Sequence, residues 1–454
     1  MINRAAEEKA LEKIYSEAGN SLTLIYGSNR SDKESFIRSF CKDKDAFYYR
    51  VRNASPKEQL SQLKSEVEDK FGIKLGLECT YDDCFRNFKS KTGQKIVVVI
   101  DEFQTIARKD EGFFPTMINL KEKKLYPGPV MIILCNSSLA WTEKEMDDCL
   151  GSAAQKIDER IKLSEVSFLD IVRLFPDYTV EESVKTYGIL GGVPEYLSLW
   201  NKKKTVKENI CELILTPGGA LFREAEDFIG SELRELSVYD TILSSIARGN
   251  EKLNDLFIDT GYSRAKISVY MKNLAAFDVI EKVVSFETGG WDNAKKGVYR
   301  IKNHFVNFWF RFIYPHLSAL YLTTPEKFYE EYIEKDLDVY LRRFFVEVCQ
   351  EYLLLMNRVG KVPIRLERMG TWVGKTGTID IIGEDNDRNH IVGICNWEKP
   401  NLTMEEYEKL LENMGLARIK ARTVYLFSAK GFDLKITSYA KDNKNVVLVD
   451  MKEL

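Results

Sequence analysis

Apolar runs and helical patterns alternate along the first 165 residues. Near-continuous apolar runs stand at SLTLIYG (21–27), KIVVVID (95–101) and VMIILCNS (130–137). Such runs are typical of parallel strands that are covered on both faces. Residues 46–51 predict a further strand, and residues 5–17, 56–71 and 82–89 predict helices. Residues 1–165 are therefore predicted to be a doubly wound α/β domain.

The rest of the chain divides into three predicted regions. Residues 166–230 are helical, with a Gly191-Gly192 break before Pro194, and we expect a helical lid. Residues 231–318 contain three helical segments, the strand-like VIEKVVSF, a turn at 287–290 and VYRIK, which is the element order of a winged helix. Apolar alternation returns after residue 318 in TIDIIGE, HIVGICNW, TVYLFSA and VVLVD, and predicts a C-terminal α/β domain at 319–454.

Composition and charge exclude several classes of protein. The chain has 454 residues, of which 44% are hydrophobic and 30% charged, so a folded globular protein is expected. A net charge of −3 gives no overall attraction to nucleic acid or to an anionic membrane, so any basic surface is local. No apolar run approaches the roughly 18 residues that span a bilayer, and the charged N-terminus lacks a secretory signal, so we expect a cytoplasmic protein with reduced cysteines and no membrane partner.

A candidate phosphate-binding loop follows the first predicted strand. Such a loop needs a second glycine to let its backbone wrap the β-phosphate, a lysine for the phosphate oxygens and a hydroxyl for Mg²⁺. Asp32 stands where that glycine is expected and Glu34 where the hydroxyl is expected, so two carboxylates would repel a triphosphate. An alternative reading is that Lys33 only pairs with one of them. The candidate nucleotide-binding residues of this loop are Gly27, Ser28, Asn29, Arg30, Lys33 and Ser35, although Ser35 stands one residue beyond the position expected for the metal hydroxyl.

An ordered set of motifs resembles a known family across essentially the whole chain. The motifs are Arg4 with Glu7 and Glu8, the loop at 27–35, DEFQ at 101–104, GGVPEYL at 191–197, and FWFRF at 308–312 with Pro315. The set is similar to archaeal and bacterial AAA+-type P-loop ATPases that carry a winged helix and a C-terminal restriction-endonuclease-like domain. The resemblance implies an α/β fold: a P-loop AAA+-like core with a helical lid, a winged helix and a restriction-endonuclease-like α/β domain.

The same resemblance implies ATP and Mg²⁺ as cofactors. Asp101 would orient Mg²⁺ and Glu102 would polarise the attacking water as a general base. Asn136, at the end of the next apolar strand, matches the family's sensor residue, and Arg160 matches an arginine that precedes the lid and contacts phosphate. Purely structural roles for Asn136 and Arg160, and a solvated strand end for the two acids, are the alternatives.

The C-terminal domain resembles a nuclease that has lost its catalytic groups. A nuclease of this fold needs a carboxylate on one strand and E-x-K on the next to hold Mg²⁺ and water. Asp380 is present, but Ile394 and Asn396 replace the glutamate and the lysine. Glu347, on the preceding helix, and Glu398, expected on the strand face of Ile394 and Asn396, are candidate replacements, and a solvated role is the alternative. We expect the fold to be retained and cleavage to be lost.

The predicted winged helix carries a basic segment. Arg264, Lys266 and Lys272 lie in SRAKISVYMKNLAAF, a stretch without acidic residues in which Ile267, Tyr270 and Leu274 are expected to face the core. A recognition helix needs such cations to meet DNA phosphates. Residues 232–302 as a whole hold 11 basic and 10 acidic residues, so DNA contact and protein contact both stay open.

The leading functional hypothesis is an ATP-binding AAA+-like protein with degenerate sites, in a regulatory or scaffold role with weak or no hydrolysis. One alternative is an active Mg²⁺-dependent ATPase in a DNA-associated process. Another is a protein-interaction module with no ligand at either site. The expected partners are DNA at the winged helix, and a protein partner or further copies of the chain.

Overall fold

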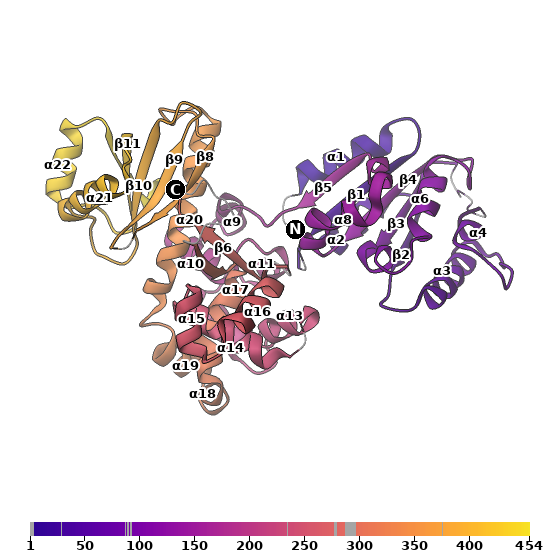
Figure 1. Ribbon diagram of the computed structural model, residues 1–454, viewed down its shortest axis with the longest axis horizontal. Helices are drawn as coiled ribbons and strands as arrows, with labels where there is room; N and C mark the ends of the chain where they lie inside the picture. Colours follow the sequence, from indigo (N-terminus) through magenta and orange to yellow (C-terminus); the bar gives the residue numbers. More distant parts are fainter. Residues whose placement is uncertain are drawn as a thin grey trace. The chain divides into compact units, whose positions relative to one another are not determined.

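The computed structural model in Figure 1 describes residues 4–28, 30–86, 88, 90, 93–233, 235–276, 279–286, 297–374 and 376–454. It divides into two compact units, Met1–Glu165 and Val166–Leu454. Among the described residues, no helix combines the length and the apolar character that crossing a bilayer requires.

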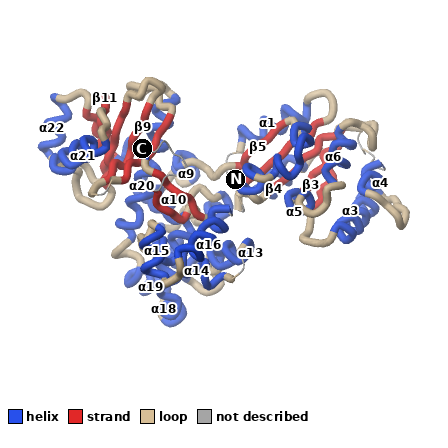
Figure 2. Tube along the Cα trace, viewed as in Figure 1, coloured by secondary structure: helices blue, strands red, loops and turns tan. Residues whose placement is uncertain are grey.

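The first unit is a five-stranded parallel sheet with the strand order β2-β3-β4-β1-β5 and helices on both faces (Figure 2). The strands are β1 (Ser21–Gly27), β2 (Ala46–Arg50), β3 (Ile96–Asp101), β4 (Val130–Asn136) and β5 (Glu159–Leu163). The helices are α1 (Ala5–Ser16), α2 (Lys33–Cys41), α3 (Pro56–Phe71), α4 (Tyr81–Arg86), α5 (Phe103–Ala107), α6 (Phe113–Lys121), α7 (Leu139–Lys144) and α8 (Met146–Leu150). β3 and β4 are buried along their entire length, which confirms the prediction from their apolar runs.

Two apolar cores hold the sheet between its helices. On one face, Leu11 of α1 and Phe36 of α2 pack with Ile25 of β1. On the other face, Leu63 of α3 and Met117 of α6 belong to the second core. Because the strands are parallel, β1, β3 and β4 all end at the same edge of the sheet, which is where ligands bind in open α/β sheets.

The second unit begins with a helical region and a two-stranded hairpin. Its elements are α9 (Phe168–Leu174), α10 (Val180–Leu190), α11 (Pro194–Leu199), α12 (Val206–Asn209), α13 (Glu224–Glu232), α14 (Leu236–Ala247), α15 (Leu253–Thr260), α16 (Arg264–Ala276), β6 (Ile280–Val284), β7 (Gly297–Ile301), α17 (His304–Phe308), α18 (Leu317–Leu322), α19 (Pro325–Tyr332) and α20 (Leu337–Arg358). Three helices, α14 to α16, thus precede the antiparallel pair β6 and β7. The turn expected at 287–290 lies outside the described residues.

The glycine pair at 191–192 separates α10 from α11. A Cβ atom on Gly192 would lie 2.1 Å from the carbonyl oxygen of Val166, so a side chain cannot be placed there. The Gly192 carbonyl also accepts a hydrogen bond from the Val166 N–H at 2.8 Å. Glycine is therefore required for the close approach of these two chain segments.

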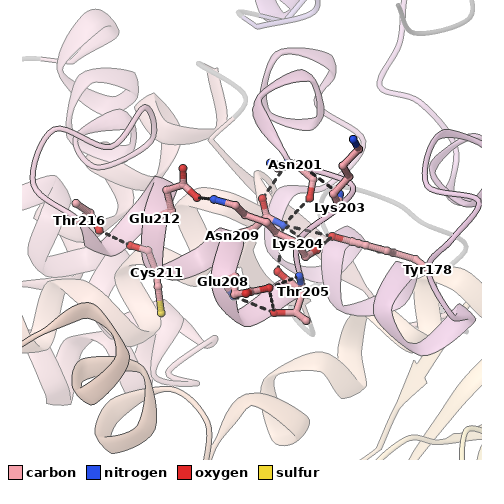
Figure 3. Close-up of polar contacts among 10 residues, drawn as sticks. All are labelled: Tyr178, Asn201, Lys203, Lys204, Thr205, Glu208, Asn209, Cys211, Glu212 and Thr216. Carbon is pink, nitrogen blue, oxygen red and sulfur yellow. Dashed lines mark hydrogen bonds and ion pairs between the residues drawn. The ribbon is translucent and has the colours of Figure 1, made fainter.

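A buried asparagine closes the turn between α11 and α12 (Figure 3). Asn209 is 1% exposed, and its Oδ1 accepts the backbone N–H of Asn201 at 2.8 Å. Its Nδ2 lies within 3.3 Å of the carbonyl oxygens of Asn201, Lys204 and Thr205 and of the Tyr178 hydroxyl. These partners satisfy the amide inside the unit, so we assign Asn209 a structural role.

The C-terminal part of the second unit is a five-stranded mixed sheet with the order β12-β11-β10-β9-β8. The elements are β8 (Arg368–Val373), β9 (Thr378–Glu384), β10 (His390–Asn396), α21 (Met404–Ala417), β11 (Ala421–Ser428), α22 (Leu434–Asp442) and β12 (Val446–Asp450). β8, β9 and β10 pair antiparallel, and β10, β11 and β12 pair parallel. The chain is therefore a mixed α/β protein with a parallel N-terminal sheet and a β-rich C-terminal part.

Candidate nucleotide-binding site

The predicted phosphate loop is a tight turn between β1 and α2. Gly27 ends β1 and Lys33 begins α2. A Cβ atom on Gly27 would lie 2.6 Å from Ser31 Oγ and 2.8 Å from the carbonyl oxygen of Leu163. Ser31 Oγ is buried and has no hydrogen-bond partner in the described structure. The turn can therefore fold back on itself only with glycine at position 27.

Asp32 stands where the resembling family has its second glycine. Its φ of 56° and ψ of 17° are left-handed, a conformation that Asn and Asp adopt more often than other non-glycine residues. Its Oδ1 accepts hydrogen bonds from Arg4 Nε at 3.4 Å and from Arg4 Nη2 at 3.1 Å. Burial raises the pKa of Asp32, and the Arg4 guanidinium opposes that rise. Asp32 thus keeps the backbone conformation of a glycine while Arg4 balances its charge.

The Lys33 side chain is buried and reaches the ends of β3 and β4. Its Nζ hydrogen-bonds Ser137 Oγ and lies 3.4 Å from Glu102 Oε1 and 3.9 Å from Asp101 Oδ1. Lys33 is only 8% exposed. The structure therefore brings the predicted phosphate lysine to the predicted acidic pair.

Glu34, at the position of the expected hydroxyl, is exposed and paired with two arginines. Arg38 Nη2 lies 2.8 Å from Glu34 Oε1, and Arg50 Nη1 lies 3.8 Å from Glu34 Oε2. Within the described part of the chain, Lys33 pairs with neither Glu34 nor Asp32. The alternative that Lys33 neutralises a carboxylate of its own loop is therefore wrong, because each of those carboxylates has its own arginine partner.

Asp101 is the last residue of β3 and is 4% exposed. The Tyr48 hydroxyl of β2 donates a hydrogen bond to Asp101 Oδ2 at 2.7 Å, and Arg50 Nε lies 3.8 Å from the same oxygen. Burial raises the pKa of Tyr48, and the hydrogen bond to the Asp101 carboxylate raises it further. Asp101 is thus oriented by the adjacent strand.

Glu102 follows in a left-handed conformation with φ 57°. Its carboxylate accepts hydrogen bonds from the Ser137 hydroxyl and from Gln104 Nε2. Burial alone would raise the pKa of Glu102, but Lys33, Ser137 and Gln104 outweigh burial and lower it. Glu102 is therefore an ionised carboxylate at neutral pH. Gln104 Oε1 is buried beside it with no hydrogen-bond partner among the described residues.

Asn136 and Ser137 have different roles at the end of β4. Asn136 is fully buried, its Oδ1 accepts the Gln104 N–H at 3.1 Å, and its Nδ2 donates to Thr142 Oγ1 at 3.1 Å. Both ends of the amide therefore have internal partners. Ser137 is the residue that contacts Lys33 and Glu102. The sequence analysis did not select it, although its place directly after a buried strand is a usable signal.

The other candidate nucleotide-binding residues differ in their burial and in their partners. Ser28 and Arg30 are half-buried in the loop, Ser35 is exposed, and Asn29 lies outside the described residues. Arg160 lies on β5 and pairs with Leu24 of β1. The β5 residue that pairs with Gly27 is Leu163, three residues further along. Its guanidinium forms an ion pair with Asp147 at 2.6 Å. This geometry favours the structural alternative for Arg160 over phosphate contact.

Asp380 and Glu347, the predicted vestigial nuclease residues, have separate partners. Asp380 Oδ2 accepts the Cys395 N–H at 2.9 Å, and burial raises the pKa of Asp380. Glu347 of α20 lies 3.2 Å from His304 Nε2 and 3.2 Å from Arg343 Nε. Across the described ranges, no group of three His, Cys, Asp or Glu side chains is arranged to hold a metal ion.

The expectation for Glu398 is wrong in one respect. β10 ends at Asn396, so Glu398 does not lie on that strand. The Asn396 side chain ends the strand itself, because its Oδ1 accepts the Lys399 N–H at 3.1 Å and its Nδ2 donates to the Lys399 carbonyl at 3.1 Å. The asparagine at the expected lysine position thus closes a turn.

The three cations selected on α16 are exposed. Arg264 donates to Asn254 Oδ1 at 2.6 Å and lies over the Phe257 ring. Lys266 lies over the Tyr262 ring at 4.3 Å. In the described structure, none of the three forms an ion pair with a carboxylate, so their charges are available to a partner.

The core face of α16 differs from the expectation at one position. Ile267, Met271 and Leu274 are buried. Tyr270 is only half-buried, and its hydroxyl hydrogen-bonds the Glu235 carboxylate, which contributes to raising the pKa of Tyr270 to about 12. The physical reason is helical spacing: Met271 follows Ile267 by four residues and therefore lies on the same face.

Family comparison places the first unit among known domains. Residues 1–199 match a family described as an ATPase domain predominantly from Archaea. The N-terminal part of this chain is an ATPase-like domain. Residues 309–410 match a second family, described as archaeal and bacterial proteins of unknown function.

Individual proteins are similar to larger parts of the chain. An uncharacterized protein of Methanocaldococcus jannaschii is 25% identical over 400 residues, which are 87% of this chain and 87% of that protein. A Walker-type ATPase of Pyrococcus abyssi is 20% identical, with a TM-score of 0.47, over 68% of this chain and 96% of the other. The ORC2 protein of Aeropyrum pernix, in ADPNP and ADP complexes, is 13% identical, with a TM-score of 0.44, over 70% of this chain and 94% of the other.

The ATPase-like domain assembles most of the groups that phosphoryl chemistry needs. A buried lysine, a strand-end aspartate and an ionised glutamate meet in Lys33, Asp101 and Glu102. In sites of phosphoryl transfer, groups of these kinds hold phosphate oxygens, position a metal and polarise water. Glu34, at the position where the sequence analysis expected a hydroxyl for a metal, has its carboxylate beside Arg38 and Arg50.

Proposed function

We propose that this protein binds ATP or ADP at the loop of residues 27–33, hydrolyses ATP slowly, and acts in a regulatory or scaffold role. The observation that carries the proposal is the convergence of Lys33 with Asp101, Glu102 and Ser137 at one edge of the sheet. The match of residues 1–199 to an ATPase family supports it. The charges of Asp32 and Glu34, which would repel a nucleotide, are balanced by arginines.

The residues fit a nucleotide better than they fit its metal. Asp101 would hold Mg²⁺, which would neutralise phosphate charge when bound. Position 34 has no hydroxyl, and Ser35 is exposed and one residue late. Lys33 is also engaged by Glu102 and Ser137, so phosphate must compete with these contacts. Weak metal binding and a competing lysine contact both favour slow turnover.

Calorimetry with ATP and with ADP, each with and without Mg²⁺, tests the binding. Lys33→Ala should abolish binding, because the lysine is the buried cation of the loop. Lys44→Ala is the matched control. Lys44 lies just after the C-terminal end of α2, has only 12% of its side chain exposed, and forms an ion pair with Glu12. Absence of nucleotide binding by the wild type, or equal binding by Lys33→Ala, would contradict the proposal.

A turnover assay tests the proposed slow hydrolysis. We expect the wild type to fall well below the roughly 1 to 100 s⁻¹ of active phosphoryl-transfer enzymes, and Glu102→Gln to remove the residual activity while leaving ADP binding intact. Turnover in the active range that Glu102→Gln abolishes would instead favour the working ATPase.

A second proposal concerns the segment from α14 to β7. We propose that it is a winged helix and that α16 contacts DNA. The supporting observation is the exposure of Arg264, Lys266 and Lys272, whose charges are not paired with carboxylates in the described structure. Phosphate contacts require such available cations. A protein partner or further copies of the chain are the competing occupants of this surface.

We further propose that the C-terminal sheet is restriction-endonuclease-like and has lost its cleavage site. The supporting observation is that Asp380 is bound to a backbone N–H while Glu347 is bound to His304 and Arg343. Metal-assisted hydrolysis needs several acidic ligands in one place.

A further inference from the structure

Arg4 makes a set of contacts of which the proposed function uses only the charge balance with Asp32. Its guanidinium donates to the Ser164 carbonyl at 2.7 Å, to the Ser31 carbonyl at 3.2 Å and to Asp32 Oδ1 at 3.1 Å. It also lies 3.4 Å from Glu7 Oε1. Arg4 is 8% exposed although it stands directly before the first helix. One side chain thus joins the start of α1, the phosphate loop and the segment after β5.

The contact with Asp32 coincides with a change in the loop itself. A glycine at position 32 would adopt φ 56° without strain and would add no charge. Aspartate adopts this conformation at modest cost, so the main liability of Asp32 is its carboxylate beside a phosphate site. Arg4 bonds that carboxylate through two nitrogens. Arg4, which also belongs to a motif similar to that of the resembling family, therefore balances the charge that Asp32 introduces.

We infer that Arg4 is a positioning residue of the nucleotide site, which lets the loop accept a phosphate by neutralising Asp32. The inference rests on the proposed nucleotide binding. It assigns Arg4 no contact with the nucleotide. Its effect passes through Asp32, and this distinguishes it from an arginine that binds phosphate directly.

A double-mutant cycle measured by ADP calorimetry tests the inference. We expect Arg4→Ala to weaken ADP binding by at least about tenfold, because Asp32 is left unpaired. In an Asp32→Gly background the same Arg4→Ala change should alter affinity by less than about threefold. Arg4→Lys should restore part of the loss. Glu7→Gln is the matched control, since it removes the other carboxylate that pairs with Arg4 and leaves Asp32 paired. This variant should bind ADP as the wild type does.

The pH dependence gives a readout that a purely structural role would not move. Burial raises the pKa of Asp32 and Arg4 lowers it, so removal of Arg4 raises it further. ADP affinity of Arg4→Ala should therefore recover as the pH falls and Asp32 becomes neutral. The double variant Arg4→Ala with Asp32→Gly corrects for titration of the nucleotide and should show no such recovery.

The outcomes separate the two proposals. If the wild type binds no ADP, the proposed function fails and this inference fails with it. If the wild type binds and Arg4→Ala binds equally well, the inference alone is overturned. A loss on Arg4→Ala that is the same in the Asp32→Gly background overturns it too, because Arg4 would then act on the nucleotide directly or through the fold.

Discussion

Position 34 is where the sequence analysis expected a hydroxyl that would help to hold Mg²⁺. Glu34→Thr supplies the hydroxyl that phosphate loops use as a metal ligand. We expect it to strengthen ATP binding on the order of tenfold in the presence of Mg²⁺, with little change in its absence. Glu34→Gln removes the charge without adding a hydroxyl and is the control. Calorimetry with and without Mg²⁺ makes the comparison, and equal effects of the two variants would show that only the charge matters.

Glu347 predicts a pH-dependent stability of the second unit. Burial alone would raise its pKa, but the hydrogen bond and charge of His304 and the charge of Arg343 outweigh burial and lower it from 4.5 to about 2. A carboxylate with a depressed folded-state pKa stabilises the protein above its unfolded pKa, and that stability is lost as the pH falls toward the folded value.

Denaturant unfolding of the wild type and of Glu347→Gln tests this prediction. Between about pH 6 and about pH 3 the wild type should lose roughly 2 kcal/mol more than the variant. Glu330→Gln, on α19, is a control that changes an exposed glutamate paired with Lys207. Parallel pH profiles of the wild type and Glu347→Gln would show that Glu347 is not held ionised by its partners.

The family resemblance assigned Lys33, Asp101 and Glu102 to one nucleotide site, and the structure brings them together because parallel strands end at one edge of a sheet. It did not allow Arg4 to be paired with Asp32, which is 28 residues away and in contact only through the folded turn. Asn136 was selected for its place at a strand end, yet its amide is used inside the protein and the adjacent Ser137 makes the contacts. Such choices depend on side-chain directions that a linear pattern does not contain.

Among the elements, α16 allows a direct test of DNA contact. If Arg264, Lys266 and Lys272 each meet a phosphate, affinity should fall with salt at a log-log slope of about −2.7 for three contacts. Changing all three to Ala should remove most of that slope and leave the fold intact, because Ile267, Met271 and Leu274 form the buried face.

Lys202 and Lys203, which are exposed after α11, provide a control when both are changed to Ala. That variant should keep the wild-type salt slope in a DNA-binding titration. No binding at low salt, or an unchanged slope in the α16 variant, would favour a protein partner for this surface.

The turn between α11 and α12 predicts a stability effect. Asn209→Ala leaves the backbone groups of Asn201, Lys204 and Thr205 without their buried amide partner (Figure 3). We expect the free energy of unfolding to fall by about 2 to 4 kcal/mol, as is usual when buried polar groups lose their partners. Asn201→Ala is the control, because its side chain is exposed. Thermal or denaturant unfolding compares them, and equal losses would contradict the role assigned to Asn209.

Element boundaries show where sequence patterns are strong and where they are not. The helix expected at 56–71 spans those residues, since Ser55 caps its start, Pro56 occupies its first turn and Gly72 ends it in a left-handed conformation. The strand expected to continue through Glu398 ends at Asn396, because a side chain there bonds the backbone of Lys399. The spacing of apolar residues in the sequence does not reveal a strand end that is set by a side-chain hydrogen bond.

For the whole molecule, we expect no DNA cleavage. Pure protein incubated with plasmid and Mg²⁺ or Mn²⁺ should leave the supercoiled form intact, because in the part of the chain that the structure describes Asp380 belongs to no group of three His, Cys, Asp or Glu side chains that could hold a metal ion. Asp380→Ala should behave identically, and a known nuclease under the same buffer serves as the positive control. Cleavage by the wild type that disappears in Asp380→Ala would show that a complete metal site exists.

The pairing of Arg4 with Asp32 also has a genetic consequence. A single base change converts an aspartate codon to a glycine codon, so the usual glycine lies one mutation away. That mutation alone would leave Arg4 with Glu7 and with the carbonyls of Ser31 and Ser164, whereas loss of Arg4 alone would leave the carboxylate of Asp32 unpaired. Loss of Arg4 is therefore costly while Asp32 is present, and among descendants of this gene we expect it only after position 32 has changed.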